Sequence, residues 1–98
     1  MYVGAVELDV LFGDVRSLKE KRSLIRPVIA ELRRRFDVAV AEAGHVELHR
    51  RSLIGVAAVA ADACHVREVL DACERLVAGQ PELELLSARH RILGPDDD

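Results

Sequence analysis

Apolar and polar residues alternate along residues 2–12, and this period of two predicts a β-strand with one buried face. The side chains expected to face a core are Tyr2, Gly4, Val6, Leu8, Val10 and Phe12. The side chains expected on the opposite, mixed face are Val3, Ala5, Glu7, Asp9 and Leu11. We therefore expect this strand to cover a core on one side only.

A helix is predicted to begin at about Leu18. Ser17 and Glu20 have the spacing of a capping box, in which the serine bonds an early helical amide and the glutamate reaches back. The apolar stripe of this helix consists of Leu18, Ile25, Val28, Ile29, Leu32 and Phe36. Pro27 lies inside the helix and predicts a kink, because proline has no amide to bond Ser23. In the alternative, residues 16–25 are partly irregular and the helix restarts near Pro27.

The rest of the pattern predicts three more strands and one more helix. Strands over residues 38–42 and 51–61 flank a polar connection, residues 43–51, that has room for some extended structure. Asp62 is the expected N-cap of the second helix, which ends at Gly79 and Pro81. Its apolar stripe consists of Val66, Val69, Leu70, Cys73, Leu76 and Val77. Residues 83–93 are the last predicted strand, and residues 94–98 are an acidic disordered tail.

The order β-α-β-β-α-β predicts an α+β fold in a single domain over residues 1–93. It is a ferredoxin-like sandwich, with a four-stranded antiparallel sheet and two helices on one face. No polar residue stands between Leu53 and Ala61, so the uncovered sheet face should expose apolar side chains, which usually marks an interface. We expect a homodimer through this face. The alternative is a monomer that tolerates small exposed Ala and Gly side chains.

Positive charge is concentrated in residues 16–35. This run holds eight of the 14 Lys and Arg residues and only two acids, which gives it a net charge of +6. Because the whole chain carries −3, the remainder carries −9. Such an asymmetry favours a polyanionic partner over a small-molecule substrate.

A row of exposed cations on a helix can follow the phosphate backbone of a nucleic acid. The residues predicted to contact RNA are Arg16, Lys19, Lys21, Arg22, Arg26, Arg33 and Arg34. Free amides at the helix N-terminus, near Ser17 and Glu20, add a second attraction for an anion. The alternative is a basic helix face that is only solvated.

Two acidic residues, Glu7 and Asp9, share one face of the first strand about 6.6 Å apart. Paired carboxylates at that distance can perform acid and base chemistry. However, Arg89 and Arg91 have the same spacing on the predicted neighbouring strand. A cross-strand ladder of ion pairs therefore explains both pairs without catalysis.

No motif indicates a metal, a cofactor or a catalytic residue. His45 and His49 would lie about 13 Å apart in an extended segment, too far to share one ion. Cys64 and Cys73 would lie about 13 Å apart on opposite faces of the second helix, so we expect reduced thiols, with Cys73 in the core. The chain has neither a Gly-rich phosphate loop nor a nucleophile elbow.

The composition of the chain limits its possible functions and its expected location further. Only three residues are aromatic, which weakens any function that needs stacked bases. No apolar run approaches the roughly 20 residues of a membrane span, and the first residues lack the charged region of a signal peptide. We expect a cytoplasmic protein without a membrane partner.

Three segments carry a family resemblance. They are S-L-K-E-K-R at residues 17–22, F-D-V-A-V-A-E at residues 36–42 and I-G-V-A at residues 54–57. Together they resemble the YlxP-like family of small bacterial proteins, also called domain of unknown function 503, over nearly the whole chain. The sequence departs from the usual pattern at Ala39, where serine is common, at His49, where tryptophan is common, and at Pro27.

The resemblance implies a ferredoxin-like fold and no established enzymatic activity. It also implies a bacterial setting, because genes of the family tend to lie among those for translation initiation and ribosome maturation. The positions that it marks are Ser17, Lys19, Glu20, Lys21, Arg22 and Glu42.

We therefore expect a noncatalytic accessory factor that binds ribosomal RNA or the small ribosomal subunit through its basic first helix. One alternative is a dimeric protein-interaction or small-ligand regulatory domain that uses the open sheet face. Another is an enzyme that uses Glu7 and Asp9.

Overall fold

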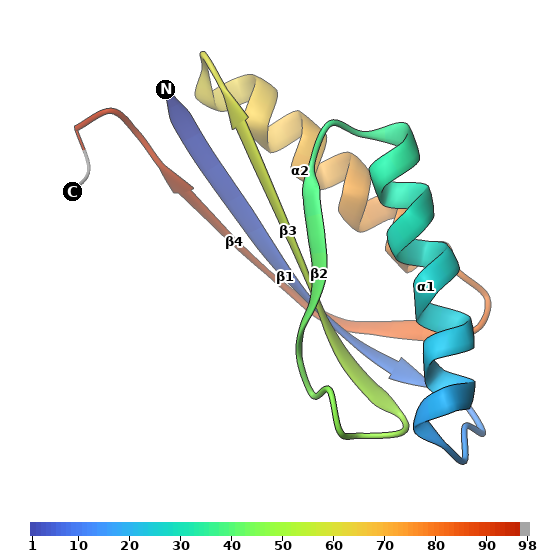
Figure 1. Cartoon of the computed structure of the whole chain (residues 1–98). Coiled ribbons are helices and arrows are strands. Elements are labelled where there is room, and N and C mark those ends of the chain that lie inside the picture. Colours follow the sequence, from blue (N-terminus) through green and yellow to red (C-terminus); the bar gives the residue numbers. More distant parts are fainter. Residues whose placement is uncertain (97–98) are drawn as a thin grey trace.

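The computed structural model describes residues 1–96 and shows a two-layer sandwich of one sheet and two helices (Figure 1). The elements in chain order are β1 (Tyr2–Phe12), α1 (Leu18–Arg35), β2 (Ala39–Gly44), β3 (Arg51–Ala60), α2 (Ala63–Ala78) and β4 (Leu83–Leu93). The four strands form one antiparallel sheet in the order β2-β3-β1-β4. The predicted ferredoxin-like α+β fold is confirmed.

The core lies between the helices and one face of the sheet. Val6, Leu8 and Val10 of β1 are fully buried there, next to Ile54 and Val56 of β3. The alternation along β1 follows the predicted strand, because the even-numbered side chains are the buried ones. The bare face of the sheet takes the odd-numbered residues of β1 and β3, which the pleat directs away from the helices.

The first helix runs without interruption from Leu18 to Arg35. Pro27 lies inside it, so the alternative of an irregular segment with a restart near Pro27 is wrong. Ile25, Val28 and Leu32 are buried, as the predicted stripe requires. The helix then ends at the cap residue Phe36, whose amide bonds the Leu32 carbonyl at 3.0 Å.

The second helix packs tightly against the centre of the sheet. Asp62 accepts a hydrogen bond of 2.7 Å from the His65 amide, which confirms the predicted N-cap. A Cβ atom at Gly4 of β1 would collide with Val66 and lie 2.9 Å from Cδ1 of Leu70. Glycine at this position therefore allows α2 to approach β1 closely.

The chain continues past the sheet. Gly94 follows β4, and Pro95 and Asp96 form a turn, while residues 97–98 of the predicted acidic tail lie outside the described residues. Within residues 1–96, neither helix is long and apolar enough to cross a membrane.

Candidate functional site

The basic helix has one cation that points into the protein. Lys21 was predicted to contact RNA, but its side chain has no exposed surface. The prediction was wrong because Lys21 lies four residues before Ile25 and seven before Val28, which places it on the buried face of α1. Lys21 is therefore a structural residue and is not available to phosphate.

Four oxygen atoms surround the Lys21 ammonium group. Its Nζ atom lies 2.9 Å from Oε2 of Glu42 and donates to the backbone carbonyls of His45 and Val46, both at 3.0 Å. The carbonyl of Arg51 is a fourth neighbour at 3.3 Å. A buried charge is tolerable when it is paired and hydrogen-bonded, and Lys21 meets both conditions.

The carboxylate of Glu42 completes this cluster. Its Oε2 atom also accepts a bond of 2.8 Å from the hydroxyl of Ser52, which is fully buried. Glu42 and Ser52 come from the neighbouring strands β2 and β3, and Lys21 comes from α1. The three side chains, which we call the lysine cluster, therefore join the start of α1 to the sheet. They give a structural role to Lys21 and Glu42, two of the positions that the family resemblance marks.

The lysine cluster also fixes the connection between β2 and β3. His45 in this connection has a φ of 55°, a left-handed conformation that is uncommon for residues other than glycine. Because Lys21 bonds the carbonyls of His45 and Val46, it holds this turn in place. Val46 and Leu48 remain 43% and 48% exposed, so the fixed turn presents apolar side chains to solvent.

The N-terminus of α1 is capped largely as predicted. The Ser17 hydroxyl accepts a bond of 3.0 Å from the Glu20 amide. The Glu20 carboxylate bonds the amide of Arg16 at 3.3 Å, one residue before the amide that a capping box would use. Because a carboxylate already lies at this helix end, the expected attraction for an external anion is weakened.

Three of the predicted RNA contacts form a free row on α1. Lys19, Arg22 and Arg26 are exposed, at successive spacings of three and four residues along one side of the helix. The side chain of none of the three has a hydrogen bond or an ion pair to any residue within 1–96. We call this row the basic stripe.

The other predicted contacts have protein partners. Arg16 pairs with Asp14 at 3.3 Å, and Arg33 donates a bond of 2.6 Å to the Val40 carbonyl of β2. Arg34 bonds Glu31 at 2.6 Å, which raises the pKa of Arg34 and lowers the pKa of Glu31 below its usual value. These contacts make the three arginines poorer candidates for phosphate binding than the basic stripe.

The predicted ladder of ion pairs between β1 and β4 does not form as expected. Glu7 lies opposite Arg89, but the same register places Asp9 opposite Ser87 and Arg91 opposite Ala5. Asp9 instead accepts bonds of 2.8 and 2.7 Å from the Nη2 atom of Arg51, on the other neighbouring strand. The carboxylate of Asp9 is therefore held in an ion pair with its guanidinium partner.

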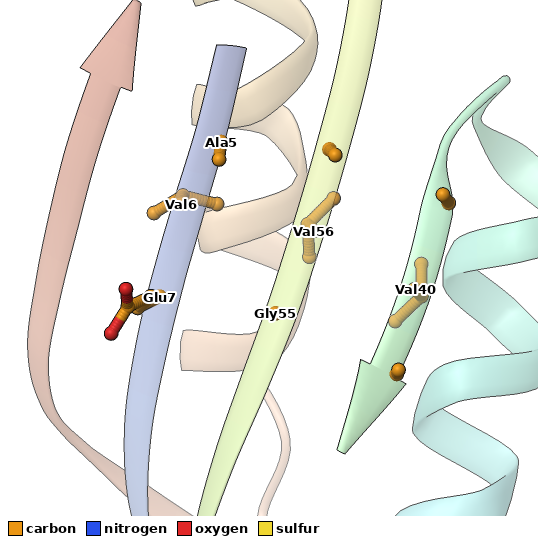
Figure 2. A pocket seen from close by; sticks show the side chains of 9 residues that line it. Ala5, Val6, Glu7, Val40, Gly55 and Val56 are labelled. Carbon is orange, nitrogen blue, oxygen red and sulfur yellow. The ribbon is translucent and has the colours of Figure 1, made fainter. Parts of the chain in front are cut away.

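The bare sheet face contains a shallow apolar depression of about 300 Å³ (Figure 2). It spans β1, β3 and β2, with the helices behind the sheet in this view. Small residues create the hollow, and those facing it are Ala5, Ala39, Ala41, Gly55 and Ala57. Glu7 lies at one side of the depression (Figure 2). Because these three strands carry no aromatic ring on the bare face, this face offers no aromatic platform on which nucleic-acid bases could stack.

The cysteines agree with the predicted reduced thiols. Cys64 is exposed and Cys73 is buried, and both are free. Burial raises the pKa of the Cys73 thiol to about 11, because the apolar surroundings disfavour a thiolate. Cys73 is therefore a core residue and an unsuitable nucleophile.

One group of side chains was missed by the sequence reasoning. The Nε2 atom of His90 on β4 lies 2.6 Å from Glu74 and 4.0 Å from Asp71, both on α2. Asp71 and Glu74 are three residues apart on one helix side, which is a signal that the sequence contains. Their pairing with a histidine depends on the position of β4 under α2.

Comparison with known proteins identifies a relative and the family of the chain. The chain is 27% identical over 82 residues to the uncharacterised protein YlxP of Bacillus subtilis strain 168, a match that covers 84% of this chain and 89% of that protein. The sequence profile of the family described as "Protein of unknown function (DUF503)" matches residues 3–90. The chain belongs to this family.

Proposed function

We propose that the protein is a noncatalytic accessory factor that binds ribosomal RNA, or the small ribosomal subunit, through the basic stripe of α1. The ribosomal partner is the one implied by the family resemblance of the S-L-K-E-K-R motif. The contact residues differ from the sequence prediction, because Lys21 is buried. The predicted contacts whose side chains are exposed and unpaired in the described residues are Lys19, Arg22 and Arg26.

The observation that carries this proposal is the unpaired state of the basic stripe. Exposed arginines elsewhere on α1 have acidic or carbonyl partners, whereas these three cations have no partner within the described residues. Lys19 and Arg26 are seven residues apart along the helix, a rise of about 10 Å. A phosphate backbone supplies closely spaced negative charges along such a distance.

The rest of the molecule restricts what the stripe can bind. The chain outside residues 16–35 carries −9, so the rest of the molecule repels polyanions that do not fit the stripe. The bare sheet face offers Glu7 and small apolar residues instead of aromatic rings. RNA recognition would therefore rest on backbone shape and phosphate contacts, with little readout of single-stranded bases.

Cosedimentation with purified small and large ribosomal subunits tests the proposal directly. Wild type should bind the small subunit with an affinity that falls as salt rises. If three phosphates are neutralised, the slope of log K against log salt should be about −2 to −3. A triple variant with Lys19, Arg22 and Arg26 changed to Gln should lose most of this binding.

A matched variant makes the result specific to the stripe. Arg67, Arg75 and Arg89 are also exposed and without ion-pair partners in the described part of the chain, so changing them to Gln removes the same charge from other surfaces. This control should bind as wild type does. Equal losses in both variants, or no binding by wild type to either subunit, would contradict the proposal.

The bare sheet face supports a second candidate function, a homodimer. The depression over β1, β3 and β2 is apolar, and Val59, Leu86 and Leu93 are 63%, 45% and 40% exposed. Single exposed apolar residues are common, but a contiguous hollow of small residues across three strands suits a packed interface.

Sedimentation equilibrium of wild type and two single variants tests this candidate. Ala57→Glu places a charge on the bare face. Ala78→Glu places the same charge at an exposed position of α2. The dimer should dissociate only in Ala57→Glu, because a charge buried in an apolar interface lacks a partner. A wild type that stays monomeric at all concentrations would remove the candidate.

A further inference from the structure

Three potential metal ligands meet at the outer surface between α2 and β4. They are Asp71 and Glu74 of α2 and His90 of β4, and their nearest ligand atoms all lie within 4.8 Å of one another. Within residues 1–96, this is the group of three His, Cys, Asp or Glu side chains with such spacing. The side chains of Glu74 and His90 are 35% and 32% exposed, so both are partly held by their surroundings.

The distances agree with a common coordination geometry. Two ligand atoms that each lie 2.0–2.1 Å from a tetrahedral zinc ion are about 3.3 Å apart. The Nε2 atom of His90 lies 2.6 Å from Glu74 and 4.0 Å from Asp71, on either side of that value. Side-chain shifts below about 1 Å would therefore bring all three atoms to bonding distance of one ion.

The chemistry of the ligands selects the class of metal. Imidazole suits zinc and neighbouring transition metals, whereas magnesium and calcium prefer sites made only of oxygen ligands. Arg67 and Arg91 line a depression of about 310 Å³ beside His90, and their positive charges oppose a dication. We therefore expect an affinity near the micromolar range, with water completing the coordination.

We propose that Asp71, Glu74 and His90 form a binding site for one Zn²⁺ ion per chain, which joins α2 to the edge strand β4. The ion would replace the direct bond between His90 and Glu74. Because β4 contacts the rest of the sheet on one side only, a metal bond to α2 would hold this edge more firmly. The site lies apart from the basic stripe and does not depend on RNA binding.

Titration of the metal-free protein with Zn²⁺ in a calorimeter tests the proposal, and absorption of the Co²⁺ form reports the coordination. Wild type should bind one Zn²⁺ per chain, and saturating Zn²⁺ should raise Tm by about 5 °C or more. His90→Gln should weaken binding at least 10-fold and abolish the visible absorption of four-coordinate Co²⁺. Glu74→Gln should weaken binding too, and circular dichroism establishes that each variant is folded.

His65→Gln is the matched control, because His65 is an exposed histidine in the first turn of α2, six residues before Asp71 and nine before Glu74. It should bind Zn²⁺ as wild type does. Three results would overturn the proposal: no saturable binding below about 1 mM, unchanged binding in folded His90→Gln, or equal affinity for Mg²⁺, which an imidazole ligand does not favour.

Discussion

The first helix contains two kinds of cation that differ only by their position on its circumference. Lys21 is fully buried and touches four oxygen atoms, whereas Lys19 and Arg22, its near neighbours in the same motif, are exposed and free of partners in the described chain. Charge and local sequence are the same for both. The direction of each side chain alone decides whether the cation serves the fold or is available to a ligand.

The S-L-K-E-K-R motif therefore contains residues with two different roles, one structural and one available for recognition. Within S-L-K-E-K-R, Ser17 and Glu20 fix the start of α1, and Lys21 attaches that start to β2 and β3. Only Lys19 and Arg22 remain for recognition. Substitutions across the motif should therefore fall into a group that unfolds the protein and a group that leaves stability almost unchanged.

Removal of the buried cation should have the largest effect. Lys21→Met leaves the Glu42 carboxylate without its counter-charge and the carbonyls of His45 and Val46 without a donor. We expect the free energy of unfolding to fall by about 3–5 kcal/mol, as for other broken buried ion pairs. Urea unfolding measures it, with Lys19→Met as the matched control, which should change stability by less than about 0.5 kcal/mol. A loss below about 1 kcal/mol in Lys21→Met would show that the lysine cluster is not important for stability.

Neutralising the acid should cost less. Glu42→Gln retains an oxygen that can accept from Ser52 and Lys21, and the three backbone carbonyls around the ammonium remain. We expect a loss of about 1–2 kcal/mol. The double variant with Lys21→Met should lose less than the sum of the two single losses, because the second change removes the unpaired charge that the first creates. Simple additivity in urea unfolding would mean that Lys21 and Glu42 do not act as a pair.

Most of the fold could be predicted because its elements depend on local periodicity. The alternation in β1, the caps at Ser17 and Asp62 and the apolar stripes all appear in the structure at the expected residues. The register between strands was harder to predict, because the observed pairing of β1 with β4 places Asp9 opposite Ser87, and its ion pair is with Arg51 of β3. Beyond this pair, a bulge between Asp9 and Val10 adds one residue to β4, and no residue pattern there indicates it.

The burial of Lys21 could have been predicted from a gap in the apolar stripe of α1. The apolar stripe of α1 steps seven residues from Leu18 to Ile25, and Lys21 fills the position between them on the same face. Such a position predicts a buried lysine only if a partner lies opposite, and Glu42 arrives there through the tertiary pairing of β2 with β3. The cluster of His90 with Asp71 and Glu74 was inaccessible for the same reason, since its members come from different elements.

The cap of α1 should give an intermediate effect. Ser17→Ala removes the oxygen that accepts from the Glu20 amide, and loss of such a cap costs about 1 kcal/mol. Ser23→Ala is the matched control, because the Ser23 hydroxyl bonds the Glu20 carbonyl inside the helix, where alanine is the better helix former. Thermal unfolding should show a lower Tm for Ser17→Ala and an equal or higher Tm for Ser23→Ala. The opposite order would contradict the role assigned to the cap.

Removal of the basic stripe should have the smallest effect on stability, and its sign matters. Glutamine has nearly the same helix propensity as lysine and arginine, and the three side chains have no partner to lose in the described structure. Lys19 lies in the first turn, where a cation opposes the helix dipole, so the triple Gln variant should be unchanged or more stable by up to about 0.5 kcal/mol in low salt. Urea unfolding at low and high salt measures this, because screening should remove any gain. Three exposed cations that stabilise nothing, one of them in the first turn where the helix dipole disfavours it, are best explained by a ligand. A triple variant that loses 1 kcal/mol or more would instead show that Lys19, Arg22 and Arg26 serve the fold, and the RNA proposal would lose its main support.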